Sequence, residues 1–254
     1  GSDGPHRDRP AFDTVAQASA GFLRLLVNPE HPRVVGPALA DALTGFYAAH
    51  GVVAALYERE KTGRGRIVET SMFEAMCHFN LDDYTHLLSM GEVMGPYSRP
   101  HVSPSYVFEC ADGKGIALHM SSPPKFWENL AEAVGRPDML GRPEFESRDA
   151  RIANYEKVIA FLAPIFGSQP RGHWADRLAE LEVPHSPVFT SQEVVDGELA
   201  AHHRIVVEAP GPYGTFRTIR SPLRFDGEAQ NEVTAPPLLG EHNGELLGRV
   251  KEEG

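Results

Sequence analysis

Apolar positions recur at helical spacing along much of the chain, and shorter β-branched or aromatic runs lie between them. The helical spacing predicts helices over residues 12–26, 41–61, 72–90, 124–134, 149–166, 171–181, 191–202 and 240–250. The shorter runs predict strands over residues 67–71, 105–110, 114–120, 183–189, 204–207 and 215–219. Asp112-Gly113 is a strong hairpin signal between two of these strands. A hairpin followed by helices and a strand makes residues 104–189 a predicted small α+β domain.

Residues 36–71 combine an acid with a long helical pattern. Asp41 stands where the pattern begins, and aspartate is a preferred N-cap residue. Gly63 follows the last periodic position and predicts a left-handed helix end. Gly45 and Gly51 lie inside the pattern, where each costs about 0.5–1 kcal/mol relative to alanine. They indicate the close approach of another element, a neighbouring chain or a ligand. From the residues alone, Asp41 is more readily explained as a cap than as a reactive group.

Glycine, proline and serine gather over residues 91–104, as in a linker. The predicted organisation is therefore a first segment at 1–95, a linker at 96–103, the small domain at 104–189 and a final segment at 190–254.

Charge and cysteine content narrow the function classes. The 254 residues carry 24 Lys and Arg against 35 Asp and Glu, a net charge of -11. Because no basic run with interleaved aromatics occurs, we expect no nucleic-acid partner. No apolar run of membrane-spanning length is evident, so we expect no membrane partner. Cys77 and Cys110 are too few for a disulfide framework, which favours a reduced, cytoplasmic setting.

Other catalytic signatures are weak. The twelve histidines lack the spacing of metal ligands, so no metal is expected. The Gly63-Arg64-Gly65-Arg66 run follows a helix and precedes a strand, the reverse of a phosphate loop, and is interpreted as a turn. No Gly-x-Ser-x-Gly motif supports a serine hydrolase.

A set of motifs around Asp41 resembles the signature of the family III CoA-transferases, the CaiB/BaiF family. That family includes formyl-CoA transferase, carnitine CoA-transferase and the α-methylacyl-CoA racemases. The matching segments are Ala40-Asp41, Thr44-Gly45, residues 51–56, the Arg59 to Gly65 run, residues 9–13, residues 109–113 and residues 237–242. Together they are much more specific than any one dipeptide.

The resemblance implies a fold and an assembly. Family members have a Rossmann-like α/β large domain interrupted by a small α+β domain, and they form interlocked homodimers. Residues 1–95 and 190–254 would then be parts of the large domain. Because the family carries further residues ahead of this region, the sequence is expected to lack the N-terminal part of that domain. We accordingly expect this chain to associate and to bind free CoA weakly.

The resemblance also implies chemistry. The aspartate matching Asp41 is the covalent nucleophile of the transferases, which move CoA between carboxylic acids through an aspartyl-CoA thioester. Acyl-CoA and a carboxylic acid are the expected substrates, with no other cofactor. Phe12 and Gln17, in the preceding segment, are candidate residues of the acyl pocket; equally, they fit the core and surface of one helix.

Two alternatives remain beside the transferase. An acyl-CoA racemase or epimerase needs two bases, one on each face of the α-carbon. The positions matching those bases hold Phe12 and Pro123, neither of which can carry a proton, so the sequence argues against racemisation. The second alternative is a catalytically inactive dimerisation fragment. Within the transferases, residues 101–105 lack the glycine run of formyl-CoA transferase, which argues against oxalate and formate as the acids.

Overall fold

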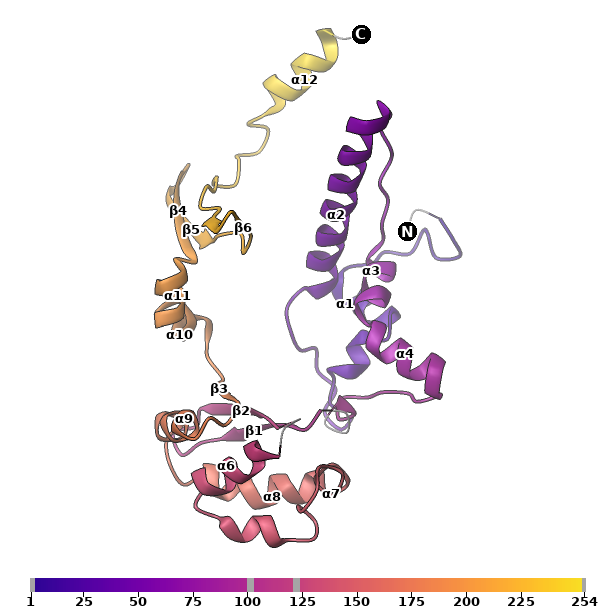
Figure 1. Cartoon of the computed structure of the whole chain (residues 1–254). Coiled ribbons are helices and arrows are strands. Elements are labelled where there is room, and N and C mark those ends of the chain that lie inside the picture. The colour runs from indigo at the N-terminus through magenta and orange to yellow at the C-terminus, as the bar shows by residue number, and fades with distance from the viewer. Residues whose placement is uncertain (1–2, 100–102, 121–123, 253–254) are drawn as a thin grey trace.

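The computed structural model describes residues 3–99, 103–120 and 124–252. Figure 1 shows the helices of the N-terminal segment and the elements of the C-terminal segment as separate groups, each joined to the small domain at one end. The three groups follow the chain in order.

The N-terminal group contains α1 (Asp13–Ser19), a 3-10 turn (Phe22–Leu25), α2 (Leu39–Thr62), α3 (Met72–Phe79) and α4 (Leu81–Met90). The single helix predicted over residues 12–26 divides because Gly21 takes a left-handed conformation, φ 71°. The helix predicted over residues 72–90 divides at Asn80, which separates α3 from α4. Helix α1 packs against both α2 and α3.

Helix α2 begins two residues earlier than predicted. Ala38 occupies the N-cap position without any side-chain cap, and Asp41 is the third helical residue. The expectation that Asp41 caps the helix is therefore wrong. The predicted end is confirmed, because Gly63 follows Thr62 with a left-handed φ of 69°.

The segment after α2 corrects a second prediction. Residues 67–71 form no strand in the structure, because no neighbouring strand among the described residues pairs with them. The segment instead runs back along α2, where a Cβ at Gly51 would lie 2.7 Å from Val68 Cγ1. Gly51 thus admits a neighbour from its own chain, whereas a Cβ at Gly45 would meet nothing within 4 Å.

The small domain is built on an antiparallel sheet in the order β1-β2-β3, with β1 (Ser105–Glu109), β2 (Gly115–His119) and β3 (His185–Pro187). The predicted hairpin is confirmed, with Ser105 paired to His119 and Glu109 to Gly115. Helices α6 (Lys125–Ala133), α7 (Arg148–Ala153), α8 (Tyr155–Phe166) and α9 (Arg171–Glu180), with a 3-10 turn at Pro137–Gly141, complete it.

One hydrophobic core holds the small domain together, from Tyr106 to Val183. Phe108 stacks on Phe166 with ring centroids 4.6 Å apart, and Tyr106 stacks on Tyr155 at 5.0 Å. Stacked pairs of this kind contribute about 0.5–1.5 kcal/mol beyond the area they bury.

The C-terminal segment contains α10 (Ser191–Val195), α11 (Glu198–His203), β4 (Val206–Gly211), β5 (Gly214–Ile219), β6 (Arg224–Phe225), β7 (Glu228–Ala229) and α12 (Asn243–Glu252). Strands β4 and β5, which overlap the strands predicted over residues 204–207 and 215–219, form a hairpin around Pro212-Tyr213. All strand pairs in the described part of the chain are antiparallel. The chain is therefore a mixed helix-and-strand protein, and the Rossmann-like large domain stays a prediction.

The chain exposes far more surface than a compact protein of its size. Its accessible surface is 17817 Å² for 27.8 kDa, whereas a compact monomer of that mass exposes about 11,000 Å². Part of the exposed surface is apolar and lies on α2, where Phe46, Val53 and Tyr57 are each about two-thirds exposed.

Helix α2 is also long and apolar enough to cross a membrane by length and composition, and 6% of its apolar window is buried. The expectation that no apolar run reaches spanning length is wrong on this measure. Length and composition alone do not distinguish a spanning helix from one that is covered by protein.

Candidate active site around Asp41

The carboxylate of Asp41 is exposed in the first turn of α2. The N–H groups of a helix's first turn lack intrahelical partners and carry the positive end of its dipole. A negative charge at this place is therefore favoured, and the side chain is open to an incoming molecule. That combination suits a carboxylate that reacts as a nucleophile.

The first turn of α2 is held from a distance rather than by a local cap. The Ala40 N–H donates to Asp13 Oδ1 of α1 at 2.7 Å, across 27 residues of sequence. The other oxygen, Oδ2, accepts from Gln17 Nε2 at 2.7 Å, and the same nitrogen lies 3.4 Å from the Pro37 carbonyl oxygen. Both carboxylate oxygens of Asp13 thus accept a hydrogen bond, one from α2 and one from α1.

Small side chains let α1 and α2 approach closely enough for this bond. Ala16, Ala20 and Ala40 pack with Met76 in one buried cluster. Tyr84 of α4 supports the end of α1, because its hydroxyl donates to the Ala20 carbonyl oxygen at 3.1 Å. The hydrogen bond with Cys77, with burial adding to it, raises the pKa of Tyr84 to about 12, so the phenol remains a donor at neutral pH.

The surface beside Asp41 is open. Gly45 lies one turn along the same face of α2, and no atom of the described residues lies within 4 Å of a Cβ placed there. Between them, the Thr44 hydroxyl is turned inward and donates to the Ala40 carbonyl oxygen at 2.6 Å. The helix therefore presents a carboxylate next to space that a flat thioester could occupy.

The two predicted pocket residues have opposite surroundings. Phe12 immediately precedes α1 and is 80% exposed, so its ring is available at the surface. Gln17 is 2% exposed. Its amide nitrogen donates to Asp13, and its Oε1 is buried with no hydrogen-bond partner among the described residues. The structure brings Gln17 to the segment before α2, while substrate contact by either residue stays a prediction.

Some positions of interest fall outside the described residues. These are Pro123, which takes the place of the second racemase base, and residues 101–102 of the region that matches the glycine-rich loop. Over residues 3–99, 103–120 and 124–252, no group of three or more His, Cys, Asp or Glu side chains is placed to hold a metal ion.

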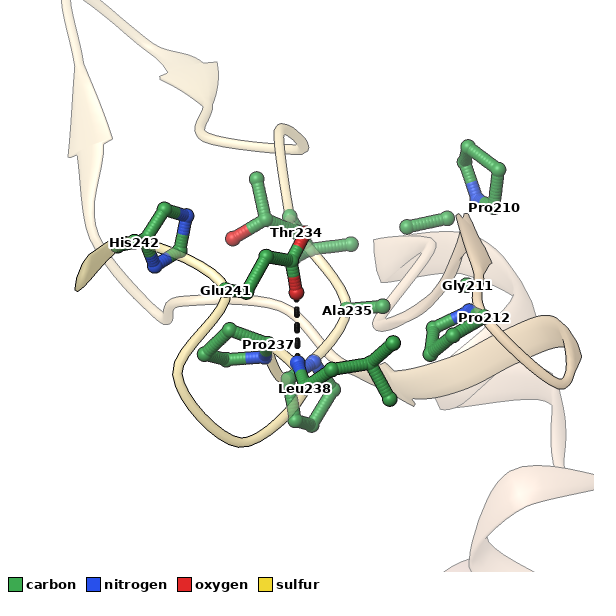
Figure 2. Close-up of a pocket in the computed structure, with 12 residues that line it drawn as sticks. Pro210, Gly211, Pro212, Thr234, Ala235, Pro237, Leu238, Glu241 and His242 are labelled. Atoms are coloured by element: carbon green, nitrogen blue, oxygen red, sulfur yellow. Dashed lines mark hydrogen bonds between the residues drawn. The ribbon is translucent and has the colours of Figure 1, made fainter. Parts of the chain in front are cut away.

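A separate hollow lies in the C-terminal segment, where residues 233–242 fold against the end of the β4–β5 hairpin (Figure 2). Its volume is about 570 Å³, and its lining is rich in proline. Glu241 is the acidic residue that lines this hollow, but one of its carboxylate oxygens already accepts from the Leu238 N–H at 2.6 Å (Figure 2). Glu241 thus closes a local turn, and the catalytic candidate remains Asp41.

Comparison with known proteins decides the family. A sequence model described as CoA-transferase family III matches residues 1–243. The chain belongs to CoA-transferase family III. The resemblance inferred from the motifs around Asp41 is thereby confirmed.

Named members of CoA-transferase family III differ in their acids. The chain is 30% identical over 262 residues to a formyl-CoA:oxalate CoA-transferase of Streptomyces avermitilis, covering 96% of this chain and 64% of that protein. It is 30% identical to a succinyl-CoA:mesaconate CoA-transferase of Haloarcula marismortui, covering 95% and 61%. The chain thus spans less than two thirds of the length of these relatives.

Solved structures of the family share the fold. A crystal structure of Rv3272 from Mycobacterium tuberculosis superposes with a TM-score of 0.80 at 29% identity, covering 96% of this chain and 66% of that one. A CaiB/BaiF family protein from Brucella suis gives 0.81 at 24% identity, covering all of this chain and 65% of that one.

Sequence reasoning missed the part played by Asp13. The residue belongs to the 9–13 motif of the family, yet its contact with Ala40 joins positions far apart in sequence. Its local signals were an acid in a helix's first turn and a glutamine four residues later, which identify a partner within α1 only.

Proposed function

We propose that the protein containing this chain transfers CoA between carboxylic acids, with Asp41 as the nucleophile. The observation that carries the proposal is the exposed carboxylate in the first turn of α2, within the motifs of a CoA-transferase family. The relatives' names support the reaction class, since each is a CoA-transferase acting on carboxylic acids. Because those acids differ, the proposal names the class and no single acid.

The reaction balances without a redox or metal partner. The Asp41 carboxylate attacks the donor thioester carbonyl, and the C–S bond breaks to give a mixed anhydride and the CoA thiolate. The thiolate attacks the Asp41 carbonyl of the anhydride, which releases the donor acid and leaves an aspartyl-CoA thioester. The acceptor carboxylate attacks this thioester and frees the thiolate again. Thiolate attack on the acceptor acyl group then regenerates Asp41.

The place of Asp41 suits these steps. Its charge is favoured at the helix N-terminus before attack. The Leu39 and Ala40 N–H groups of this turn already have acceptors, so we assign the Asp41 N–H as the backbone donor to the tetrahedral oxyanions that form at each step. We keep Phe12 and Gln17 as candidate residues for the acyl group, with Phe12 supplying apolar surface.

We also propose that the protein works as an interlocked homodimer in the cytoplasm. The support is the surface excess of the chain and the exposed apolar side chains of α2, which need a cover. A second subunit would bury them and would remove the reason to place α2 in a membrane. Light scattering on the purified protein should give at least a dimer without detergent; a monomer that requires detergent would contradict this.

The test of the nucleophile uses the complete protein and its acyl-CoA donor. Hydroxylamine added during turnover should modify Asp41, and Asp41→Ala and Asp41→Asn should each abolish exchange of CoA. The matched control is Asp82→Ala, which removes an exposed first-turn acid from α4 and should leave exchange within about twofold, since surface changes away from the site cost little. Substantial exchange by Asp41→Ala would overturn the proposal.

Two further measurements distinguish the transferase from the racemase and from the inactive dimerisation module. A racemase would wash solvent deuterium into the α-carbon of a 2-methylacyl-CoA, and we expect none because Phe12 cannot carry a proton. An inactive dimerisation module would associate normally but would neither exchange CoA nor become labelled at Asp41.

A further inference from the structure

The start of α2 depends on a residue that the transfer reaction does not use. Its N-cap residue, Ala38, supplies no side-chain acceptor, and the Leu39 N–H turns back to the Pro37 carbonyl oxygen at 2.8 Å. The next N–H, that of Ala40, has Asp13 Oδ1 as its acceptor. The residue after Ala40 is Asp41, so this bond fixes the backbone immediately before the proposed nucleophile.

Asp13 is itself held rigidly. It is the first residue of α1, and its second oxygen is fixed by Gln17, whose side chain is almost fully buried. Ala40 is completely buried against α1, so the peptide that carries the donated hydrogen has no room to tilt. One carboxylate therefore joins two helix N-termini, where the positive ends of both dipoles favour its charge.

We infer that Asp13 is a positioning residue for Asp41: through the Ala40 N–H it fixes the first turn of α2, and Gln17 holds Asp13 in place. The role rests on the proposed function only where it concerns catalysis. Misplacing a reacting group by about 1 Å can cost roughly 100-fold in rate. Loss of the Asp13 bond should therefore lower kcat while leaving KM for acyl-CoA nearly unchanged.

The direction of the hydrogen bond between Gln17 and Asp13 can be reversed by exchanging acid and amide between the two positions. This exchange tests the hydrogen bond itself rather than the presence of either side chain. In Asp13→Asn, the amide oxygen can still accept from Ala40, but the NH₂ group then faces the NH₂ group of Gln17. In Gln17→Glu, two carboxylates face each other. In the double variant Asp13→Asn/Gln17→Glu, the asparagine NH₂ group donates to the new carboxylate, so the bridge is rebuilt with its direction reversed. The weak 3.4 Å contact with Pro37 is not recovered, so the rescue should be partial.

The experiment measures kcat, KM and hydrogen exchange of the α2 first turn in the complete protein. Asp13→Ala should lower kcat at least about 10-fold and should speed exchange at residues 39–42, because the Ala40 amide loses its acceptor. The double swap should recover most of both losses relative to either single variant. The matched control, Ser71→Ala, removes the side-chain cap of α3, where Ser71 Oγ accepts from the Glu74 N–H. It should leave kcat within about twofold, since the side-chain hydrogen bonds of Ser71 go to Glu74 of α3 and not to the start of α2.

Three results would overturn the inference. They are unchanged exchange at residues 39–42 in Asp13→Ala, an equal loss of kcat in Ser71→Ala, and a double swap no better than the worse single variant. Failure of the proposed function would look different. If the wild-type protein transferred no CoA, exchange at residues 39–42 would still show whether Asp13 holds the helix start.

Discussion

The small domain and the N-terminal helices reach stability by different routes. The core of the small domain contains large side chains that are fully or almost fully buried, among them Tyr106, Phe145, Phe166 and Leu162. The buried cluster of the N-terminal group consists of Ala16, Ala20, Ala40 and Met76. Helix α2 extends well beyond that cluster and leaves its apolar side chains in solvent.

This difference in buried side chains indicates that the two regions contribute differently to the protein. Burial of large aromatic and aliphatic groups gives the small domain a hydrophobic core of its own. The N-terminal helices have close, small contacts that set geometry at Asp41, but too little buried area to hold a 24-residue helix alone. The candidate active site thus lies on the region that needs a cover, so the self-association and the catalysis that we propose both involve this region.

The largest expected effect is on the stability of the small domain, and a pair of phenylalanine variants tests whether the two regions unfold separately. Phe166→Ala removes a stacked core ring and should destabilise the small domain by about 3–5 kcal/mol. Phe46→Ala removes a ring that is 69% exposed and should leave the small domain unchanged while weakening self-association. Both tryptophans of the chain, Trp127 and Trp174, lie in the small-domain core, so their fluorescence during urea unfolding reports on that domain alone.

Far-ultraviolet circular dichroism and sedimentation supply the second readout for this pair. The helical signal should become concentration-dependent in Phe46→Ala, because more of the chain is then unassociated. If Phe46→Ala lowered the tryptophan-detected stability as much as Phe166→Ala, the two regions would form one cooperative unit and the comparison would fail.

Local sequence signals predicted much of the small domain correctly. The hairpin around Asp112-Gly113 and the α6 and α9 helices have strong turn signals or clear periodicity. The breaks at Gly21 and Asn80 were missed because an apolar period can continue across a change of direction. Residues 67–71 were assigned as a strand from β-branching alone, and a strand needs a neighbour for its backbone bonds.

The candidate site was predictable only in part. The motifs singled out Asp41 as the candidate nucleophile, whereas no local rule could supply the contact between Asp13 and Ala40 at the start of α2. Gln17 was singled out as a pocket residue, and its burial beneath α2 follows from the α1–α2 contact rather than from its own neighbours in sequence.

Gly45 and Gly51 of α2 differ in whether another part of the chain packs against them. Gly51→Ala would place a Cβ against Val68, whereas Gly45→Ala meets open space. Alanine is favoured over glycine in a helix by about 0.5–1 kcal/mol, so Gly45→Ala should stabilise α2 by that amount. Gly51→Ala should lose that gain, and Gly51→Ala/Val68→Ala should restore it. Helical thermal unfolding measures all three.

The order of the two variants should reverse for activity, because the more stable Gly45→Ala should be the less active. Gly45→Ala adds a methyl group one turn from Asp41 and should reduce CoA transfer, while Gly51→Ala should reduce it less. Equal stability of the two single variants would mean that residue 68 does not pack on α2 in solution.

A smaller effect tests the core of the small domain. The Tyr106 hydroxyl is buried with no hydrogen-bond partner among the described residues, and burial raises its pKa well above the ordinary value. Tyr106→Phe removes an unpaired polar group without changing the ring stacks, so it should stabilise the domain by up to about 1 kcal/mol. Tryptophan-detected urea unfolding measures the change. A loss of more than about 1 kcal/mol would show that the hydroxyl is bonded, for example to a buried water.

The smallest effect concerns the junction between the small domain and the C-terminal segment. Glu193 of α10 accepts from Arg171 at 2.6 Å, from the Thr190 N–H at 2.9 Å and from Lys114 at 3.0 Å. The Arg171 bond, then the Thr190 and Lys114 bonds, hold the pKa of Glu193 well below its ordinary value of 4.5. A lowered pKa in the folded state means that these contacts stabilise the junction above pH 4.5 and are lost as the pH falls below it.

Glu193→Gln removes the titrating group, so the variant should be less stable than wild type at pH 7, and the two should converge as the pH falls below 4.5. The measurement is the urea midpoint by tryptophan fluorescence, since Arg171 and Lys114 both belong to the small domain. Glu208→Gln is the matched control, because its pair with Arg217 within the β4–β5 hairpin is exposed and contributes little. If Glu193→Gln and wild type differed equally at every pH, Glu193 would act through packing rather than charge. If instead Glu193→Gln matched wild type at every pH, the small domain would be independent of the segment that follows it, which would make the contrast with the N-terminal helices sharper still.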